Sequence, residues 1–298
     1  MTAIPYDEFS YLADNAADAG LFLDNEPRVA RVSATLGDGR LISAIAWQLA
    51  PPELVLLHGG AQNAHTWDTT MLALQEPALC IDLPSHGHSG PPRKAAHDVV
   101  GNADDLAEVI AALAPAADTL VGMSLGGLTA LAMLANHPLR FERLVLVDIT
   151  PEPNPEAAKA IVDFVNGPAN FASLDAMLER TMAFNPTRSE SSLRRGILHN
   201  AVQLDDGSWV WRHRRGEFEA FAIDYHALWG LAETITIPVL LCRGMNSGSV
   251  ITDELEAEFL RRMPNARVQR FENAGHSIQG DAPLALADAI RSFHAATR

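Results

Sequence analysis

The sequence predicts an α/β fold in which a mostly parallel, twisted sheet is flanked by helices. First, short and almost uninterrupted apolar runs recur along the chain, and a parallel sheet buried on both faces needs strands of this kind. Second, helical stretches separate these runs, as βαβ connections require. Third, the alternation is interrupted once, by a mainly helical segment that begins at Pro151.

The first part of the core is predicted at residues 29–150. Residues 1–28 before it are expected to form a helical extension, to which no chemistry is assigned. Strands at 29–35 and 42–49 flank a Gly-Asp-Gly turn at 37–39, which predicts a hairpin. Further strands are expected within residues 53–60, 77–84, 119–127, 143–151, 237–244 and 266–276, and helices at 103–114 and 128–137.

Residues 151–235 are predicted to be a cap inserted into the core, which resumes at residues 236–298. The insert has mainly helical patterns, followed by a hairpin at 202–211. An insert of this length within one α/β pattern is expected to belong to the same domain.

Length and composition indicate a globular protein. The 298 residues suffice for one large domain or for a core domain with an insert. Hydrophobic residues make up 48% and charged residues 20%, which argues against extensive disorder. The net charge of −15 disfavours nucleic acid and anionic membranes as partners, because phosphate binding needs a basic face.

A cytoplasmic location is expected. No apolar run approaches the roughly 18 residues of a membrane span, and the first residues lack the basic and apolar regions of a signal peptide. Cys80 and Cys242 lie inside apolar runs, so buried free thiols are expected instead of a disulfide or metal pair. The protein is expected to be a monomer or a homodimer.

The sharpest motif is Gly-Met-Ser-Leu-Gly-Gly at residues 122–127, between an apolar run and a predicted helix. In a G-x-S-x-G motif the serine occupies a strained strand-to-helix turn, and side chains at the glycines would clash with neighbouring backbone. This turn exposes the hydroxyl of Ser124 near the positive end of a helix, which favours developing negative charge. The simpler interpretation is a Gly-rich turn that contains a serine.

Two other loops fall where a serine nucleophile needs them. The small residues after the strand at 53–60 let backbone amides approach a substrate oxygen, so the amides of Gly60 or Ala61, together with Leu125, are predicted to form an oxyanion hole. His276 follows the last predicted strand and comes after the serine in chain order, as a general base should. Taken singly, a plain Gly pair and a surface histidine are the simpler interpretations.

Five motifs in order make residues 29–298 resemble an α/β-hydrolase-fold enzyme. They are LLHGG, DLPSHGHSG, VGMSLGG, LVLVDITP and AGHSIQGDAP. The resemblance implies the α/β-hydrolase fold with a cap after the sixth strand. It also implies a serine hydrolase that requires no metal and no organic cofactor.

The acid of the triad is an open choice. Family members usually carry it in a Gly-x-x-Asp loop after the seventh strand, where this chain has Gly-Met-Asn-Ser at 244–247. A subgroup of family esterases has Val-Asp-Ile-x-Pro after the sixth strand and Gly-x-x-Ser after the seventh, and this chain resembles it in both respects. The favoured acid is therefore Asp148. Its simpler role would be to cap a helix or turn where the chain enters the insert. The rival acid Asp253 lies where a helix is expected to begin.

Four further residues are expected to line the substrate pocket. Asn63, His65 and Trp67 lie just beyond the oxyanion loop, and Met123 precedes the serine. They are expected to surround the substrate without taking part in the chemistry.

Two other clusters have a functional and a structural interpretation. His86 and His88 have an H-x-H spacing that could bind zinc, but no third ligand stands at a recognisable spacing, and a structural turn is favoured. The aromatic and basic cluster at 209–215 (Trp209, Trp211, Arg212, His213, Arg214 and Arg215) could guide a carboxylate-bearing substrate. A hairpin edge whose arginines pair with surface acids is the favoured interpretation.

The predicted function is hydrolysis of a small-molecule ester, with lactones and thioesters as the next substrate classes. Ser124 would attack the carbonyl while His276 takes its proton and Asp148 orients the imidazole. The alternatives are a C–C bond hydrolase, a cofactor-independent dioxygenase with a His–Asp base, and a small-molecule receptor without turnover. Fold alone does not decide between them.

Overall fold

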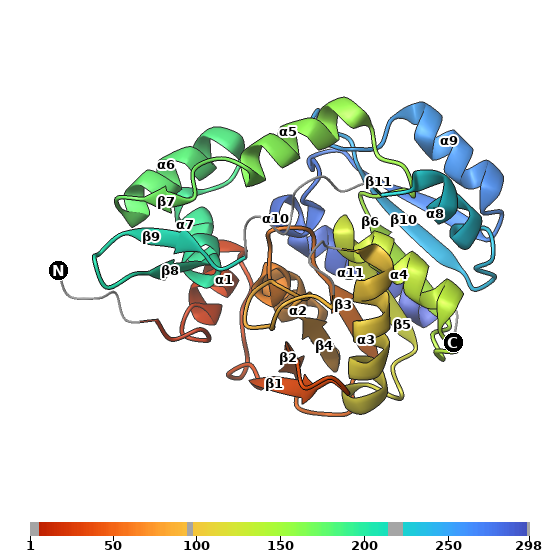
Figure 1. Ribbon diagram of the computed structural model, residues 1–298, viewed down its shortest axis with the longest axis horizontal. Coiled ribbons are helices and arrows are strands. Elements are labelled where there is room, and N and C mark those ends of the chain that lie inside the picture. The colour runs from red at the N-terminus through yellow and green to blue at the C-terminus, as the bar shows by residue number, and fades with distance from the viewer. Residues whose placement is uncertain (1–5, 94–97, 214–222, 297–298) are drawn as a thin grey trace.

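The computed structural model describes residues 6–93, 98–213 and 223–296, and an eight-stranded sheet lies at its centre (Figure 1). The strand order is β1-β2-β4-β3-β5-β6-β10-β11. The strands are β1 Val29–Thr35, β2 Leu41–Trp47, β3 Leu54–Leu57, β4 Ala78–Ile81, β5 Thr119–Met123, β6 Arg143–Val147, β10 Val239–Gly244 and β11 Ala266–Phe271.

The sheet is parallel apart from one edge. The strand β2 pairs antiparallel with both β1 and β4, whereas every pairing from β4 to β11 is parallel. All residues of β3, β4, β5, β6 and β10 are buried, which explains why these strands read as continuous Val, Leu and Ile runs. The predicted sheet and hairpin are thus confirmed, and the predicted free thiols of Cys80 and Cys242 are both buried.

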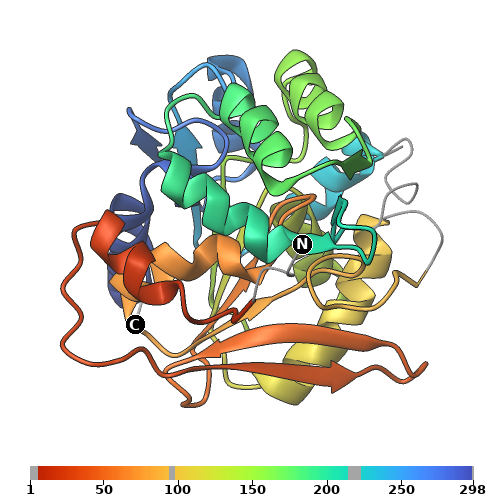
Figure 2. The same cartoon turned by 90° about the vertical axis from the view of Figure 1, so that its left-hand side faces the viewer.

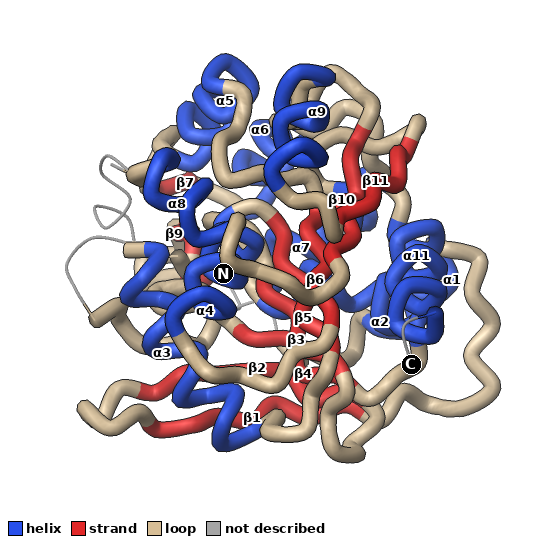
Figure 3. The backbone as a smooth tube through the Cα atoms, turned by 90° about the vertical axis from the view of Figure 1, so that its right-hand side faces the viewer, coloured by secondary structure: helices blue, strands red, loops and turns tan. Residues whose placement is uncertain are grey.

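Helices cover both faces of the sheet (Figure 3). One face packs in a single apolar cluster with α3 Val99–Leu113, α4 Leu125–Asn136, α8 Tyr225–Ala232 and α9 Asp253–Arg262. The other packs with α1 Leu12–Asp18, α2 Asp68–Leu74, α10 Ile278–Asp281 and α11 Pro283–Ala296. None of the described helices is both long and apolar enough to cross a bilayer.

The part of the chain from α5 to β9, called the cap below, forms a separate layer above the sheet (Figure 1), whereas α8 returns to the face of the sheet. The cap contains α5 Pro155–Val165, α6 Leu174–Phe184, α7 Glu190–Asn200 and a small antiparallel sheet in the order β7-β9-β8. These strands are β7 Asn170–Phe171, β8 Ala201–Gln203 and β9 Trp209–Trp211, so a hairpin forms within residues 202–211. Buried residues of α6, α7 and this small sheet form an apolar cluster of their own.

The N-terminal helix α1 joins this upper layer to the core. Figure 2 shows α1 beside α7, and Arg195 of α7 donates hydrogen bonds to Asn15 and Asp18. The hydroxyl of Ser191 also donates to Asp18, at 2.7 Å. The sequence assigned no contact to this extension, yet it holds the cap.

The strand-to-helix turn after β5 depends on a glycine that has no room for a side chain. A Cβ at Gly122 would lie 2.6 Å from the Cα of Gly127, which is backbone and cannot move away cheaply. We expect Gly122→Ala to lower the free energy of unfolding by on the order of 3 kcal/mol, measured by urea unfolding. The matched control is Gly230→Ala in α8, where nothing lies within 4 Å and a gain of about 0.5–1 kcal/mol is expected. Equal unfolding midpoints for the two variants would contradict this account of the turn.

Candidate active site

Ser124 lies at a strained turn between β5 and α4. Its backbone has φ 49° and ψ −119°, a conformation that L-residues rarely adopt, and such strain persists only where the surroundings impose it. A side chain at Gly126 would meet the backbone carbonyls of Leu57 and His58. The glycines thus let α4 approach β3 closely enough for the serine to reach the carboxyl edge of the sheet.

Asp148 is fully buried at the end of β6, and four donors surround its carboxylate. Oδ1 accepts from the Gly244 amide at 2.9 Å and from the Ser249 hydroxyl at 2.7 Å. Oδ2 accepts from the Val250 amide at 3.0 Å and from Nδ1 of His276 at 2.9 Å. With its proton on Nδ1, the His276 ring has Nε2 available as a base.

The loop that begins at Gly244, the last residue of β10, supplies three of these four donors. It is the same Gly-x-x-Ser loop that lacks an acid, and it lies beside Asp148 because β6 and β10 are parallel neighbours whose carboxyl ends coincide. Sequence reasoning missed Ser249 and Val250. The only sequence signal for these donors was that Gly-Met-Asn-Ser at 244–247 has no aspartate, while the run at 143–147 is followed directly by Asp148.

Asp253 lies away from this arrangement. It is the first residue of α9, its side chain is 86% exposed, and it pairs with Arg243 at 2.8 Å. The structure therefore brings His276 to Asp148 and not to Asp253.

Two of the three amides expected in an oxyanion hole remain available. The Ala61 amide already donates to Nε2 of His86 at 2.9 Å, and Nδ1 of that ring donates to the Pro84 carbonyl. The amides of Gly60 and Leu125 carry no hydrogen bond within the described part of the chain, and both residues line the cavity. Gly60 is thus the available member of the predicted pair, and His86 positions the loop that holds it.

The histidines of the H-x-H motif make contacts within the turn. His86 is buried against the loop that contains Gly60 and Ala61. The backbone amide of His88 donates to Asp82 at 3.0 Å. Asp82 also accepts from the Ala64 amide at 2.7 Å. These contacts agree with the structural turn that the sequence favoured.

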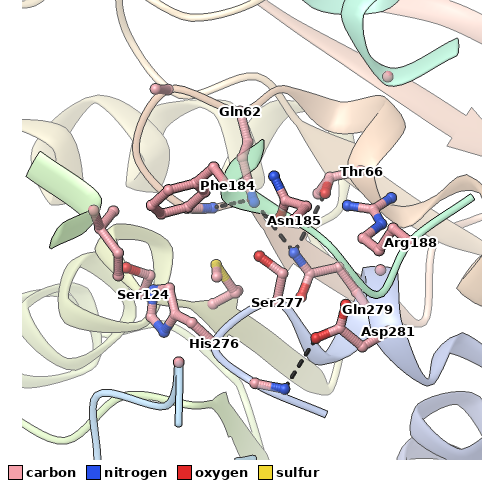
Figure 4. A pocket seen from close by; sticks show the side chains of 18 of the residues that line it. Gln62, Thr66, Ser124, Phe184, Asn185, Arg188, His276, Ser277, Gln279 and Asp281 are labelled. Carbon is pink, nitrogen blue, oxygen red and sulfur yellow. Dashed lines mark hydrogen bonds between the residues drawn. The ribbon is translucent and has the colours of Figure 1, made fainter. Parts of the chain in front are cut away.

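A cavity of about 1240 Å³ connects Ser124 and His276 with the cap and with α1. Figure 4 shows the side chains of both residues on the same part of its wall. Of the four predicted pocket residues, Asn63, His65 and Met123 line the cavity.

Trp67 was placed incorrectly. The short 3₁₀ helix Ala64–Trp67 turns this side chain inward, where it is fully buried in the apolar cluster below the sheet. Successive side chains of this short helix point in different directions, so His65 lines the cavity while Trp67 points into the core.

The aromatic and basic cluster of the cap is described only in part, because Arg214 and Arg215 lie outside the described residues. Trp211 lines the cavity, and the guanidinium of Arg212 stacks over the ring of Tyr6, 5.3 Å from its centroid. The described arginine thus contacts the N-terminal segment instead of lining the cavity.

A buried network connects the N-terminal segment, the core and the cap. His65 contacts Asp68 through Nδ1 at 2.9 Å and Glu8 through Nε2 at 3.1 Å. Its ring stacks on His199 of α7, with 3.8 Å between centroids. Tyr6 completes the link with a 2.9 Å hydrogen bond to Nδ1 of His199.

Three members of this network have the spacing of a metal site. The ligand atoms of His65, Asp68 and His199 all lie within 4.8 Å of one another. Both nitrogens of His65 already make hydrogen bonds to carboxylates, which leaves no lone pair on this ring for a metal ion. These hydrogen bonds indicate that the cluster is a network of ion pairs and not a metal site.

Charge pairing shifts two pKa values in this network. Burial alone would lower the pKa of His65, but the carboxylates of Asp68 and Glu8 outweigh it and raise the pKa from 6.5 to about 9. Burial alone would raise the pKa of Glu8, but hydrogen bonds from His65 and Arg31 lower it from 4.5 to about 2.

These shifts predict that His65 stabilises the fold in acid more than in alkali. A raised pKa contributes stability that is complete below about pH 6.5 and is lost as the pH rises through about 9, on the order of 3 kcal/mol in total. The lowered pKa of Glu8 contributes above about pH 4.5 and is lost toward about pH 2. We expect the difference in melting temperature between wild type and His65→Gln to be largest near pH 5.5 and to shrink by pH 9.5. The exposed His226→Gln is the control, and a difference that grows with pH would contradict the assignment.

Comparisons with known proteins identify the family to which this fold belongs. The model of the alpha/beta hydrolase family matches residues 54–289. The esterase Rv0045c of Mycobacterium tuberculosis is 43% identical over 292 residues, which cover 96% of this chain and 95% of that protein. Its crystal structure superposes with a TM-score of 0.85, at 41% identity, over 98% of this chain and 99% of that one.

A more distant relative is the sn-1-specific diacylglycerol lipase ABHD11 of Mus musculus. It is 27% identical over 251 residues, which cover 81% of this chain and 80% of the lipase. The region that matches the family model begins at β3, so it contains six of the eight strands of the large sheet, the layer above it and the loops that carry Ser124, Asp148 and His276. The chain belongs to the alpha/beta hydrolase family, with the character of its esterases.

Proposed function

We propose that this protein hydrolyses carboxylic esters of small molecules with Ser124 as nucleophile, His276 as general base and Asp148 as the triad acid. The observation that carries the proposal is the 2.9 Å contact between Nδ1 of His276 and Asp148, at the wall of the cavity that Ser124 also lines. The esterase that is 43% identical over almost the whole chain supports an ester as substrate.

The first half of the reaction forms an acyl-enzyme. Nε2 of His276 removes the proton of Ser124 as its hydroxyl oxygen attacks the ester carbonyl. Asp148 holds the imidazole in the required tautomer and stabilises the positive charge that it acquires. The amides of Gly60 and Leu125 donate to the oxyanion, and His276 then returns the proton to the departing alcohol.

The second half repeats these steps with water. His276 activates the water molecule, which attacks the acyl carbonyl and releases the acid and the free serine. Residues of the cap and of α1 form the outer walls of the cavity and would contact a bound substrate. Residues of the cap thus select the substrate that reaches Ser124.

The test is covalent labelling with a fluorophosphonate, followed by intact-mass analysis and peptide mapping. One adduct on the peptide that contains Ser124 is expected, because only an activated serine reacts at an appreciable rate. A folded protein that forms no adduct would contradict the serine mechanism. Oxygen uptake and ligand binding without turnover would then test the dioxygenase and receptor alternatives.

A further inference from the structure

One end of the cavity is polar, and the proposed reaction does not use it. Figure 4 shows Thr66, Asn185, Arg188 and Gln279 across the cavity from Ser124. The side-chain amide of Gln279 donates to the Thr66 hydroxyl at 3.3 Å, whereas its Oε1 is buried without a partner in the described chain. A wholly apolar acyl chain would supply no acceptor to the donors at this end, whereas Oε1 of Gln279, itself an acceptor, needs a donor.

Arg188 carries the charge of this polar end. Its guanidinium packs over Gly280, where an added Cβ would lie 2.8 Å from Cζ. Nη2 donates to the Ser192 hydroxyl at 3.2 Å, while Nε is buried and makes no hydrogen bond with any described residue. The guanidinium is therefore fixed in place with donors to spare.

No carboxylate of the described residues pairs with Arg188. The other arginine in the cavity wall, Arg195, is different, because it donates to both Asp18 and Asn15. Asp281 is close enough to act on the charge of Arg188, but it forms no ion pair with it, and its Oδ2 accepts from the Gly275 amide at 2.9 Å.

The uncompensated charge is unfavourable in the absence of a ligand. Desolvation lowers the pKa of Arg188, the carboxylate of Asp281 opposes this effect, and the positive charge of Arg195 adds to it. A guanidinium stays protonated nonetheless, and Arg188 is partly buried at the cavity wall, so an anion that pairs with it would offset the cost of this partial desolvation. Such a group at the wall of a cavity favours an anionic ligand.

We propose that Arg188 anchors a carboxylate-binding subsite, and that the substrates are esters with a carboxylate remote from the scissile bond. The inference rests on the proposed ester hydrolysis and names its substrate class. A planar guanidinium binds a carboxylate through two parallel hydrogen bonds. Because a single unpaired cation faces the nearby negative charge of Asp281, a monoanion fits better than a phosphate dianion.

The carboxylate can belong to either half of the ester. His276 must lie beside the departing alcohol oxygen, and Arg188 packs on Gly280, four residues further along the same loop and helix. An alcohol part that leaves past His276 therefore has a route toward Arg188, and a long acyl part can fill the same cavity of about 1240 Å³. The experiment therefore needs two sets of substrates, one with the carboxylate on the acyl part and one with it on the alcohol part.

The test compares charged and neutral substrates of equal shape. The acyl arm uses 4-nitrophenyl hemiesters of adipic and suberic acid against the same chains ending in a carboxamide. The alcohol arm uses butyrate esters of 4-hydroxybutyrate and 6-hydroxyhexanoate against those of the matching hydroxyamides. In at least one arm, wild type is expected to favour the carboxylate by about 10- to 100-fold in kcat/KM, as for hydrogen bonds to a charged partner.

Variants assign the preference to one side chain. Arg188→Gln is expected to abolish the preference while the kcat/KM for neutral esters stays within about 3-fold, and Arg188→Lys is expected to keep part of it. The control Arg194→Gln removes an exposed arginine that pairs with Asp175 and should change neither value. Equal rates for charged and neutral substrates in both arms, or a preference that survives in Arg188→Gln, would overturn the subsite.

Binding without turnover separates this inference from the reaction. Calorimetry with monomethyl adipate and with 4-acetoxybutyrate should detect binding to Ser124→Ala that is weakened at least 10-fold by the additional change Arg188→Gln. Tighter binding of a phosphate-terminated analogue of either ligand would contradict the carboxylate assignment. Binding that depends on Arg188, in a wild-type protein that neither reacts with the fluorophosphonate nor hydrolyses esters, would instead refute only the proposed function.

Discussion

Replacement of Ser124 by alanine is expected to lower kcat for carboxylic esters by about 10⁵-fold or more, close to the residual rate from binding and the oxyanion hole alone. The alanine variant lacks the oxygen that forms the acyl-enzyme, while Asp148, His276 and the amides of Gly60 and Leu125 stay in place. Stopped-flow assays with 4-nitrophenyl butyrate measure both the burst of 4-nitrophenol and the steady rate. Both should disappear together.

A glycine variant at the same position separates chemistry from folding. Because Ser124 has φ 49°, Ser124→Gly relieves backbone strain and is expected to be about 1 kcal/mol more stable than Ser124→Ala. Both variants should be equally inactive. Turnover within 10-fold of wild type in either variant would place the nucleophile elsewhere and would contradict the role of the strained turn.

The features that the sequence predicted depend on local patterns. Continuous apolar runs identified the buried strands, and the small residues at 122–127 identified the turn because a side chain there has no space. The relation between Asp148 and His276 was also accessible, since each follows a strand that ends at the same edge of the sheet. Parallel topology converts such chain positions into proximity in space.

The features that the sequence did not predict depend on contacts between distant segments. Nothing in the local pattern of α1 indicates that Asp18 binds Arg195 of the cap. Similarly, Arg188 is one of several arginines in the polar stretch around α6 and α7, and only the tertiary structure shows that it faces a cavity without an acidic partner among the described residues. The prediction that Trp67 lines the pocket was wrong for a related reason. The sequence does not show which side chains of the short helix Ala64–Trp67 point to the cavity and which point to the core.

The second large effect on activity is expected at Asp148, the proposed acid of the triad. Asp148→Asn is expected to lower kcat/KM for esters by about 10³- to 10⁴-fold. An asparagine of similar shape offers one oxygen and one amide nitrogen to four groups that all donate, so at least one donor loses its acceptor. If the nitrogen faces His276, the ring turns to the wrong tautomer. If it faces Gly244 and Ser249, the imidazolium still loses its counter-charge.

Two variants test whether the loss comes from the charge beside His276. Ser249→Ala removes one donor from Oδ1 but keeps the carboxylate, so a decrease of about 10-fold or less is expected. Asp253→Asn changes an exposed residue that pairs with Arg243, and activity within about 2-fold of wild type is expected. Thermal unfolding of each variant excludes a global loss of structure. A severe defect in Asp253→Asn together with near wild-type activity in Asp148→Asn would contradict the assignment of the acid to the end of β6.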